Sequence, residues 1–196
     1  PGDRLNESQL GRELNVSRAP IREALQLLQE QGLVVNHPRR GMFVVSLEPE
    51  DVQKINNLRM ILEAEALRLA RAGRQTAGLR KLSQILDRMD RMAPGPASQQ
   101  AQIDLEFHHT IWTMTGNEYL ARILTSLTSP LFAHALLSKT PAEKARMVLD
   151  SHRPLYDFVR GASDVPAEEV MLAHLRLRWN WKWTEADSAA ATASEA

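Results

Sequence analysis

At the start of the chain, apolar residues recur with the spacing of a short amphipathic helix. Within the stretch Val16 to Leu33, Ile21, Leu25 and Leu28 fall at i, i+4 and i+7 and predict one buried stripe. Arg18 and Arg22 lie four apart near its beginning and share another face. The stretch also carries helix start and stop signals, namely Ser17 as N-cap, Pro20 in the first turn and Gly32 at the end.

The segments on both sides of this helix extend the pattern. Upstream, residues 6–9 (Asn-Glu-Ser-Gln) are typical of a capping box, which predicts a short helix through Leu14 and a tight turn into the next helix. Downstream, two β-branched and aromatic runs, 34–35 and 43–45, enclose a turn with Arg39 and Arg40 at its tip. The order helix, turn, Arg-bearing helix and Arg-tipped hairpin predicts a winged helix-turn-helix that reads DNA.

Each part alone has a simpler interpretation, since an arginine pair is usually a solvated helix face and a short hairpin is usually only a hairpin. Their order within about 45 residues is the specific signal. SQLGRELNVSRAPIREALQLLQEQGLV followed by RRGMFV resembles the head of the GntR family of bacterial transcription regulators. The resemblance implies a DNA-binding set of Ser17, Arg18, Arg22, Arg39, Arg40 and Gly41.

By this resemblance, Arg18 and Arg22 contact bases and phosphates in the major groove, because the arginine fork can bind guanine or a phosphate bidentately. Arg40 with Gly41 brings the wing tip to the minor groove, and Arg39 adds a phosphate contact. Two departures from the family pattern stand out. Ser8 replaces an arginine that many relatives carry, and the family's first helix is missing before Pro1, so we expect the true N-terminus to lie upstream.

The rest of the chain shows helical periodicity without a competing strand signal. Pro and paired acids at 48–50 predict a linker between a head at 1–47 and a helical domain at 51–184, followed by a flexible tail at 185–196. We expect six helices, possibly seven, and a mainly α fold. Their predicted ranges are 51–72, 76–92, 98–115, 117–138, 141–161 and 166–184. Pro130 and Pro154 fall inside two of these helices and should kink or break them.

Four polar residues lie on stripes that otherwise face the core. Asp104 and His108, four apart, are flanked by apolar positions of one helix, and His152 and His174 have similar surroundings in two later helices. A single inward histidine is more often a hydrogen-bonded core residue than a ligand. Four such groups without partners would cost roughly 1 to 3 kcal/mol each, so they should satisfy one another or hold a divalent metal such as zinc, nickel or manganese.

A second resemblance supports the metal. IDLEFHHTIWTMTGN, SHRPLYDFV and MLAHL look like the FCD effector-binding domain of the FadR subfamily, with the six-helix count of its VanR-like branch. In many members the matching Asp and three His hold a metal at the floor of a helical cavity. A small carboxylate or sugar-acid effector would then complete the metal sphere. His134 is a candidate for the cavity wall. Arg59 could clamp an effector carboxylate, but an ordinary salt bridge to Glu63 is the favoured explanation.

Composition narrows the class of protein. The 196 residues carry 24 basic and 24 acidic side chains, which argues against a nonspecific nucleic-acid binder. The absence of cysteine excludes thiolate ligands and leaves His and carboxylates to bind metal. No apolar run reaches the roughly 18 residues of a membrane span. A cytoplasmic location and no membrane partner follow mainly from the family.

Together these features predict a ligand-responsive transcription regulator, more often a repressor, that binds double-stranded operator DNA as a homodimer. Two alternatives use the same four residues. In a metal-sensing regulator the cation itself is the signal. In a metal-dependent hydrolase the site would activate water, but the sequence places no glutamate beside the ligands as a general base and would leave the DNA-reading head unexplained.

Overall fold

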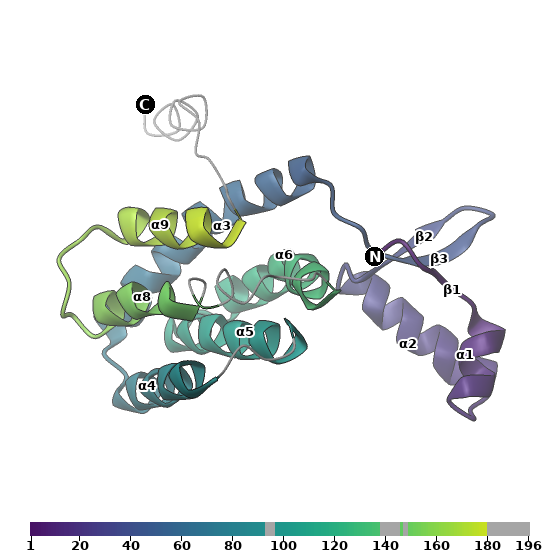
Figure 1. Cartoon of the computed structure of the whole chain (residues 1–196), viewed down its shortest axis with the longest axis horizontal. Coiled ribbons are helices and arrows are strands. Elements are labelled where there is room, and N and C mark those ends of the chain that lie inside the picture. The colour runs from purple at the N-terminus through teal and green to yellow at the C-terminus, as the bar shows by residue number, and fades with distance from the viewer. Residues whose placement is uncertain (93–96, 138–145, 147–148, 180–196) are drawn as a thin grey trace.

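The chain folds into a small N-terminal head and a larger helical domain, which lie at opposite ends of the molecule in Figure 1. A computed structural model describes residues 1–92, 97–137, 146 and 149–179. The head contains two helices and a three-stranded sheet, and the remaining described elements are helices. The predicted fold class, a winged helix-turn-helix followed by an all-helical domain, is confirmed.

The two helices of the head begin close to their predicted caps. In α1 (Glu7–Glu13) the Asn6 side chain accepts from the backbone N–H groups of Ser8 and Gln9 at 3.0 and 3.1 Å. The Gln9 side chain binds Glu13 instead of completing the predicted capping box. In α2 (Arg18–Glu30) Ser17 holds the N-cap position, but its hydroxyl makes no capping hydrogen bond.

The buried stripe of α2 and its end agree with the prediction. Ile21 and Leu25 are buried and Leu28 is half-buried, so these positions hold α2 against the rest of the head. Gly32 follows the helix with a φ of +72°, a backbone conformation that residues with a Cβ atom rarely adopt. A Cβ at Gly32 would lie 3.2 Å from Cγ of Pro130, so this glycine also allows the head to approach the helical domain closely.

The predicted hairpin forms two strands of a three-stranded sheet. Strands β2 (Val34–His37) and β3 (Gly41–Val44) pair antiparallel, with Val34 opposite Val44 and His37 opposite Gly41. Strand β1 (Arg4–Leu5) adds to the other edge of β3, which gives the order β1-β3-β2. Our sequence analysis missed β1, because two residues are too short to show an alternating pattern.

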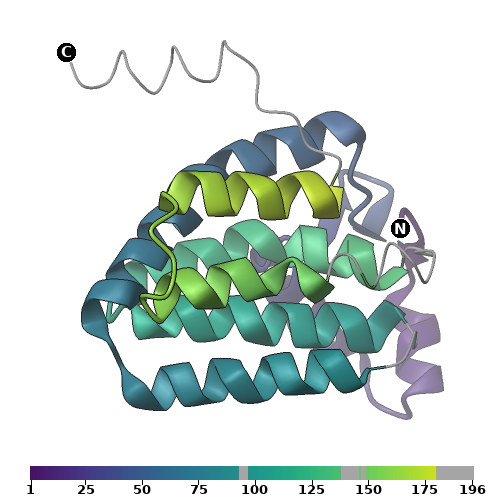
Figure 2. The same cartoon turned by 60° about the vertical axis from the view of Figure 1, so that its left-hand side comes forward.

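The helical domain packs around α5. Its described helices are α3 (Pro49–Gly73), α4 (Thr76–Arg91), α5 (Ala97–Met114), α6 (Glu118–Leu137), α8 (His152–Val159) and α9 (Ala167–Trp179). Helix α5 contacts α3, α4 and α6, while α3 also packs against α8 and α9 (Figure 2). The largest side chains of this core include Phe107 and Trp112 of α5. Among the described helices, none has the length and apolar content needed to cross a membrane.

Several boundaries differ from the prediction for local reasons. Helix α3 begins at Pro49, inside the predicted linker, because Glu48 and Asp51 cap it reciprocally. Helix α8 begins at His152 after a turn at Ser151, so Pro154 occupies a first turn, where its missing N–H does no harm. Helix α6 continues through Pro130 without breaking. The predicted tail, 185–196, lies outside the described residues.

Candidate metal centre and nucleic-acid interface

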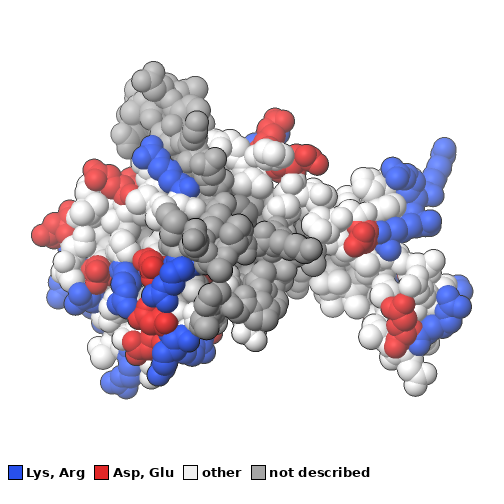
Figure 3. Space-filling view, in the orientation of Figure 1, with Lys and Arg blue, Asp and Glu red and all other residues white. Residues whose placement is uncertain are grey.

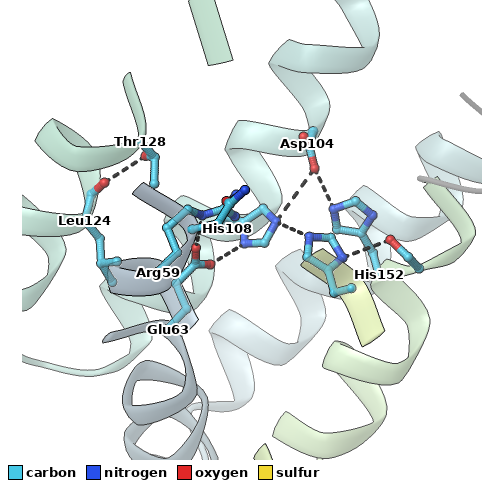
Figure 4. Close-up of polar contacts among 10 residues, drawn as sticks. Arg59, Glu63, Asp104, His108, Leu124, Thr128 and His152 are labelled. Carbon is cyan, nitrogen blue, oxygen red and sulfur yellow. Dashed lines mark hydrogen bonds and ion pairs between the residues drawn. The ribbon is translucent and has the colours of Figure 1, made fainter. Parts of the chain in front are cut away.

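The four predicted polar residues meet in the interior of the helical domain. Helix α5 supplies Asp104 and His108, α8 supplies His152 from its first turn, and α9 supplies His174 (Figure 4). All four side chains are buried, and one donor atom of each lies within 4.8 Å of the others. Residues distant in the sequence thus form one compact cluster of three imidazoles and one carboxylate.

The distances within this cluster fit a divalent metal ion. Nε2 of His152 lies 2.6 Å and Nε2 of His108 lies 3.7 Å from Oδ1 of Asp104, and the Nε2 atoms of His108 and His174 are 3.1 Å apart. An ion bound at about 2.0 to 2.2 Å by nitrogen and oxygen holds neighbouring donors about 3 Å apart. The donor set and its spacing therefore match zinc, and also nickel or manganese.

The outer nitrogen of each histidine has an acceptor of its own. Nδ1 of His108 lies 2.8 Å from Oε2 of Glu63, Nδ1 of His152 lies 3.1 Å from the Leu149 carbonyl, and Nδ1 of His174 lies 2.8 Å from the Ser151 hydroxyl. With the proton on each Nδ1, which these contacts allow, the three Nε2 lone pairs would face one another and the Asp104 carboxylate. A metal ion at the centre would accept all three lone pairs and so offset their mutual repulsion.

The protonation of His174 is consistent with this arrangement. Burial lowers the pKa of His174 well below its ordinary value, and the neighbouring His152 and His108 lower it further, against the opposing effect of Asp104. The imidazole is therefore neutral at physiological pH. A neutral imidazole is the form that binds metal ions, so no proton has to be displaced from this ligand.

A buried ion pair on α3 borders the cluster. Nε of Arg59 donates to Oε1 of Glu63 at 2.6 Å, and Nη1 donates to Oδ1 of Asn56 at 3.4 Å. The simple salt bridge that the sequence allowed for Arg59 is confirmed. Burial alone would raise the pKa of Glu63, but Arg59 and His108 outweigh it and lower the pKa to about 2. Glu63 is therefore an ionised carboxylate beside the four clustered residues.

From the sequence, Glu63 was expected only as an ion-pair partner of Arg59, and its contact with His108 was missed. Glu63 shares the inward stripe of α3 with Asn56 and Arg59, so a search for polar residues on apolar stripes would have found it. The predicted cavity residue His134 is half-buried on α6 and is not one of the four clustered residues.

The predicted DNA-reading side chains are exposed on the head. Lys and Arg side chains lie at the outer end of the head, at the wing tip and beside α1 (Figure 3). Arg18 is the first residue of α2, and Arg22 follows one turn later with 70 % of its side chain exposed. Glu7 of α1 accepts from Nη2 of Arg22 at 3.0 Å and from Nε at 3.4 Å. These two hydrogen bonds fix the position of the Arg22 guanidinium on the surface of the head.

The wing tip combines backbone turns with cations. Arg39 has a φ of +64° and Gly41 one of +93°, which form the tight turn between β2 and β3. The Arg40 guanidinium lies 5.4 Å from the centre of the Phe43 ring. Arg4 of β1 extends beside Gly41, where a Cβ would come within 3.8 Å of its guanidinium. The missed strand thus brings another cation to the base of the wing.

Comparison with known proteins agrees with both halves of this description. Residues 1–44 match the bacterial regulatory proteins of the gntR family, and residues 54–177 match the FCD domain. This chain belongs to the GntR family. It is 30 % identical to the HTH-type transcriptional regulator YdhC of Bacillus subtilis over 89 % of this chain and 79 % of that protein. The gluconate operon transcriptional repressor of Bacillus licheniformis is also 30 % identical, over 77 % of this chain and 64 % of the repressor.

The fold has a counterpart among solved structures. Escherichia coli McbR/YncC superposes with a TM-score of 0.73 at 19 % identity, covering 90 % of this chain and 84 % of McbR/YncC.

The family matches decide the class of protein. This GntR-family protein is a transcription regulator with an FCD domain, not an enzyme, and the hydrolase alternative is set aside. The FCD domain is a domain type known for metal binding, and the buried cluster of this chain has donor atoms suited to a metal ion.

Proposed function

We propose that this GntR-family regulator binds operator DNA as a homodimer and is switched by a small carboxylate that joins a metal ion in the helical domain. The observation that carries the proposal is the convergence of three Nε2 atoms and one carboxylate oxygen, each histidine being oriented by its own outer acceptor. The metal ligands are Asp104, His108, His152 and His174, and zinc is the preferred ion. A metal bound there acts as a Lewis acid for an oxygen ligand.

Charge balance supports an anionic effector. A divalent ion with the Asp104 carboxylate has a net charge of plus one, while Glu63 and Arg59 cancel each other. An isolated charge is costly in a buried site, and a monocarboxylate bound to the metal would neutralise it. We assign Arg59 and His134 as the residues that contact the rest of this effector. The wider class includes sugar acids, whose hydroxyl groups offer further oxygens to the metal.

The first test is elemental analysis of protein purified without a metal-affinity tag, followed by operator binding with and without chelator. About one divalent metal per chain, together with an effect of added carboxylates on operator affinity, agrees with the proposal. If chelation alone changes operator affinity and no carboxylate does, the cation is the signal and the metal-sensing alternative holds. In either case the regulator acts on operator DNA. We place the regulator in the bacterial cytoplasm.

DNA recognition is tested by Arg22→Ala. Loss of the guanidinium should weaken operator binding by about 1 to 3 kcal/mol, because a bidentate arginine contact to a base contributes that much. The helical content should not change, since the Arg22 side chain is exposed. The measurement is fluorescence anisotropy at fixed salt on DNA selected from a random library by the wild-type protein.

A matched control for this variant is Arg80→Ala, which removes an exposed arginine of α4 far from the head elements. It should bind the selected DNA like the wild type. Equal affinities of the Arg22 variant and the wild type would contradict the assignment of α2 as the reading helix.

The proposed dimer interface lies on α3 and α6, which pack against each other. Both helices expose large apolar side chains, each between 50 and 66 % accessible, namely Leu58, Ile61, Tyr119 and Ile123. A dimer would cover these groups and place two heads on two half-sites. We propose a second copy of this chain as their partner.

Charge on this face should disrupt the dimer. The double variant Ile61→Glu with Ile123→Glu is expected to sediment as a monomer at concentrations where the wild type is a dimer, because four carboxylates would be buried in a symmetric interface. Analytical ultracentrifugation provides the measurement. Val165→Glu, an equally apolar and 45 % exposed position before α9, should leave the dimer intact. A dimeric double variant would locate the interface elsewhere.

A further inference from the structure

The three histidines of the metal centre differ in the acceptor behind them. A backbone carbonyl faces His152, a neutral hydroxyl faces His174, and the ionised carboxylate of Glu63 faces His108. We propose that Glu63 is a positioning residue that sets the metal affinity of the centre by acting through His108. The inference rests on the proposed metal site and adds to it a determinant that does not touch the ion.

The geometry gives Glu63 a single orientation. One oxygen, Oε1, accepts from Nε of Arg59 at 2.6 Å, and the other, Oε2, lies 2.8 Å from Nδ1 of His108. The Arg59 and Glu63 side chains are 2 % and 3 % exposed, so water has little access to either. Because both oxygens are used, the carboxylate cannot rotate without losing a contact. Arg59 thus holds Glu63, and Glu63 holds the ring of His108.

The charge of Glu63 matters as much as its position. An anionic acceptor on Nδ1 makes the imidazole a stronger electron donor at Nε2, and this effect acts through the hydrogen bond even though Arg59 balances the net charge of Glu63. A hydroxyl or a carbonyl can fix the ring but carries no net charge. Among the outer acceptors of the three histidines, Glu63 should therefore have the largest effect on metal affinity.

Glu63 also comes from a helix that supplies none of the four ligands. The ligands lie on α5, α8 and α9, whereas Glu63 and Arg59 lie on α3 (Figure 4). Through the contact between Glu63 and His108, the packing of α3 becomes part of the metal centre. Changes in outer contacts of this kind typically alter metal affinity by about 10- to 100-fold.

The test uses the 196-residue chain, stripped of metal and titrated with Zn²⁺ in competition with a chromogenic chelator. Glu63→Gln keeps the shape of the side chain and removes its charge, and Zn²⁺ affinity should fall by about 10- to 100-fold. Ser151→Ala removes the neutral acceptor of His174 and should have a smaller effect. Glu63→Gln leaves the Arg59 charge buried without its partner. The double variant Arg59→Met with Glu63→Gln therefore tests the loss of the anionic acceptor of His108 without an unpaired cation.

The outcomes separate this inference from the proposed function. Wild-type protein that binds no Zn²⁺ would overturn the metal site and the inference with it. Wild-type binding with unchanged affinity in the Glu63 variants would leave the metal site standing and overturn the inference alone. A purely structural role for Glu63 would lower the unfolding temperature of the metal-free protein and leave the Zn²⁺ affinity unaltered. If Ser151→Ala lowered the Zn²⁺ affinity as much as Glu63→Gln does, the charge of Glu63 would have no special effect on that affinity.

Discussion

Asp104→Ala is expected to abolish metal binding. Asp104 is the anionic member of the proposed ligand set, and its Oδ1 lies beside the Nε2 atoms of two histidines. Without it, three neutral imidazoles must bind a dication alone in a buried site. We expect the affinity to fall by more than about 100-fold, the upper end of the effects seen for outer contacts. Elemental analysis should find about one metal per wild-type chain and almost none in the variant.

Two further variants define this result. His174→Ala should lose metal as completely as Asp104→Ala, because each removes one of four ligands. Asp157→Ala, which removes an exposed carboxylate of α8 paired with Arg160, should keep the wild-type stoichiometry. Full metal content in the Asp104 variant would mean that the four residues form a hydrogen-bonded core and not a metal site.

Arg59→Met is expected to destabilise the protein strongly. Its guanidinium is buried with the Glu63 carboxylate, and its removal leaves a buried carboxylate that has lost its cation and keeps its contact with the His108 ring. Such changes typically cost about 3 to 5 kcal/mol in the free energy of unfolding. Urea unfolding of the metal-free protein, followed by circular dichroism, measures this quantity directly.

A double variant distinguishes charge from packing in this prediction. Arg59→Met with Glu63→Met removes both charges and should recover most of the lost stability, since apolar replacements of buried pairs are often neutral. Arg68→Met breaks exposed ion pairs with Glu65 of the same helix and Glu168 of α9, and it should cost less than about 1 kcal/mol for each pair. If Arg59→Met were no more harmful than Arg68→Met, the buried pair would contribute little.

Much of the helical domain could be predicted from sequence because periodicity and punctuation act locally. The stripes of α4 and α5 and the stops at Gly73 and Gly116 lie within a few residues of the structure's boundaries. The cluster of the four polar residues could also be predicted, because a buried polar residue on an apolar stripe must find a partner. The structure brings together the four predicted residues from three helices.

The features that escaped prediction depend on tertiary neighbours. Strand β1 exists because β3 offers it an edge, and the contact between Glu7 and Arg22 exists because α1 lies across α2. The turn at Ser151 ends a stretch whose local pattern continues as helix, and it lets the Ser151 hydroxyl reach His174. In each case the sequence allows several local states, and packing selects one of them.

Helix α3 runs without interruption from Pro49, just after the head, to Glu63, beside the proposed metal site. It spans 25 residues from Pro49, and at about 1.5 Å per residue Glu63 lies about 21 Å from its first residue. A rotation of α3 by about 10° about Glu63 would move that first residue by about 4 Å, close to the 3.4 Å rise between successive bases of one DNA strand. In the proposed dimer the same rotation would occur in both copies of α3. A change at the contact between Glu63 and His108 that turned α3 by this amount would therefore shift each head by about one base step on its half-site.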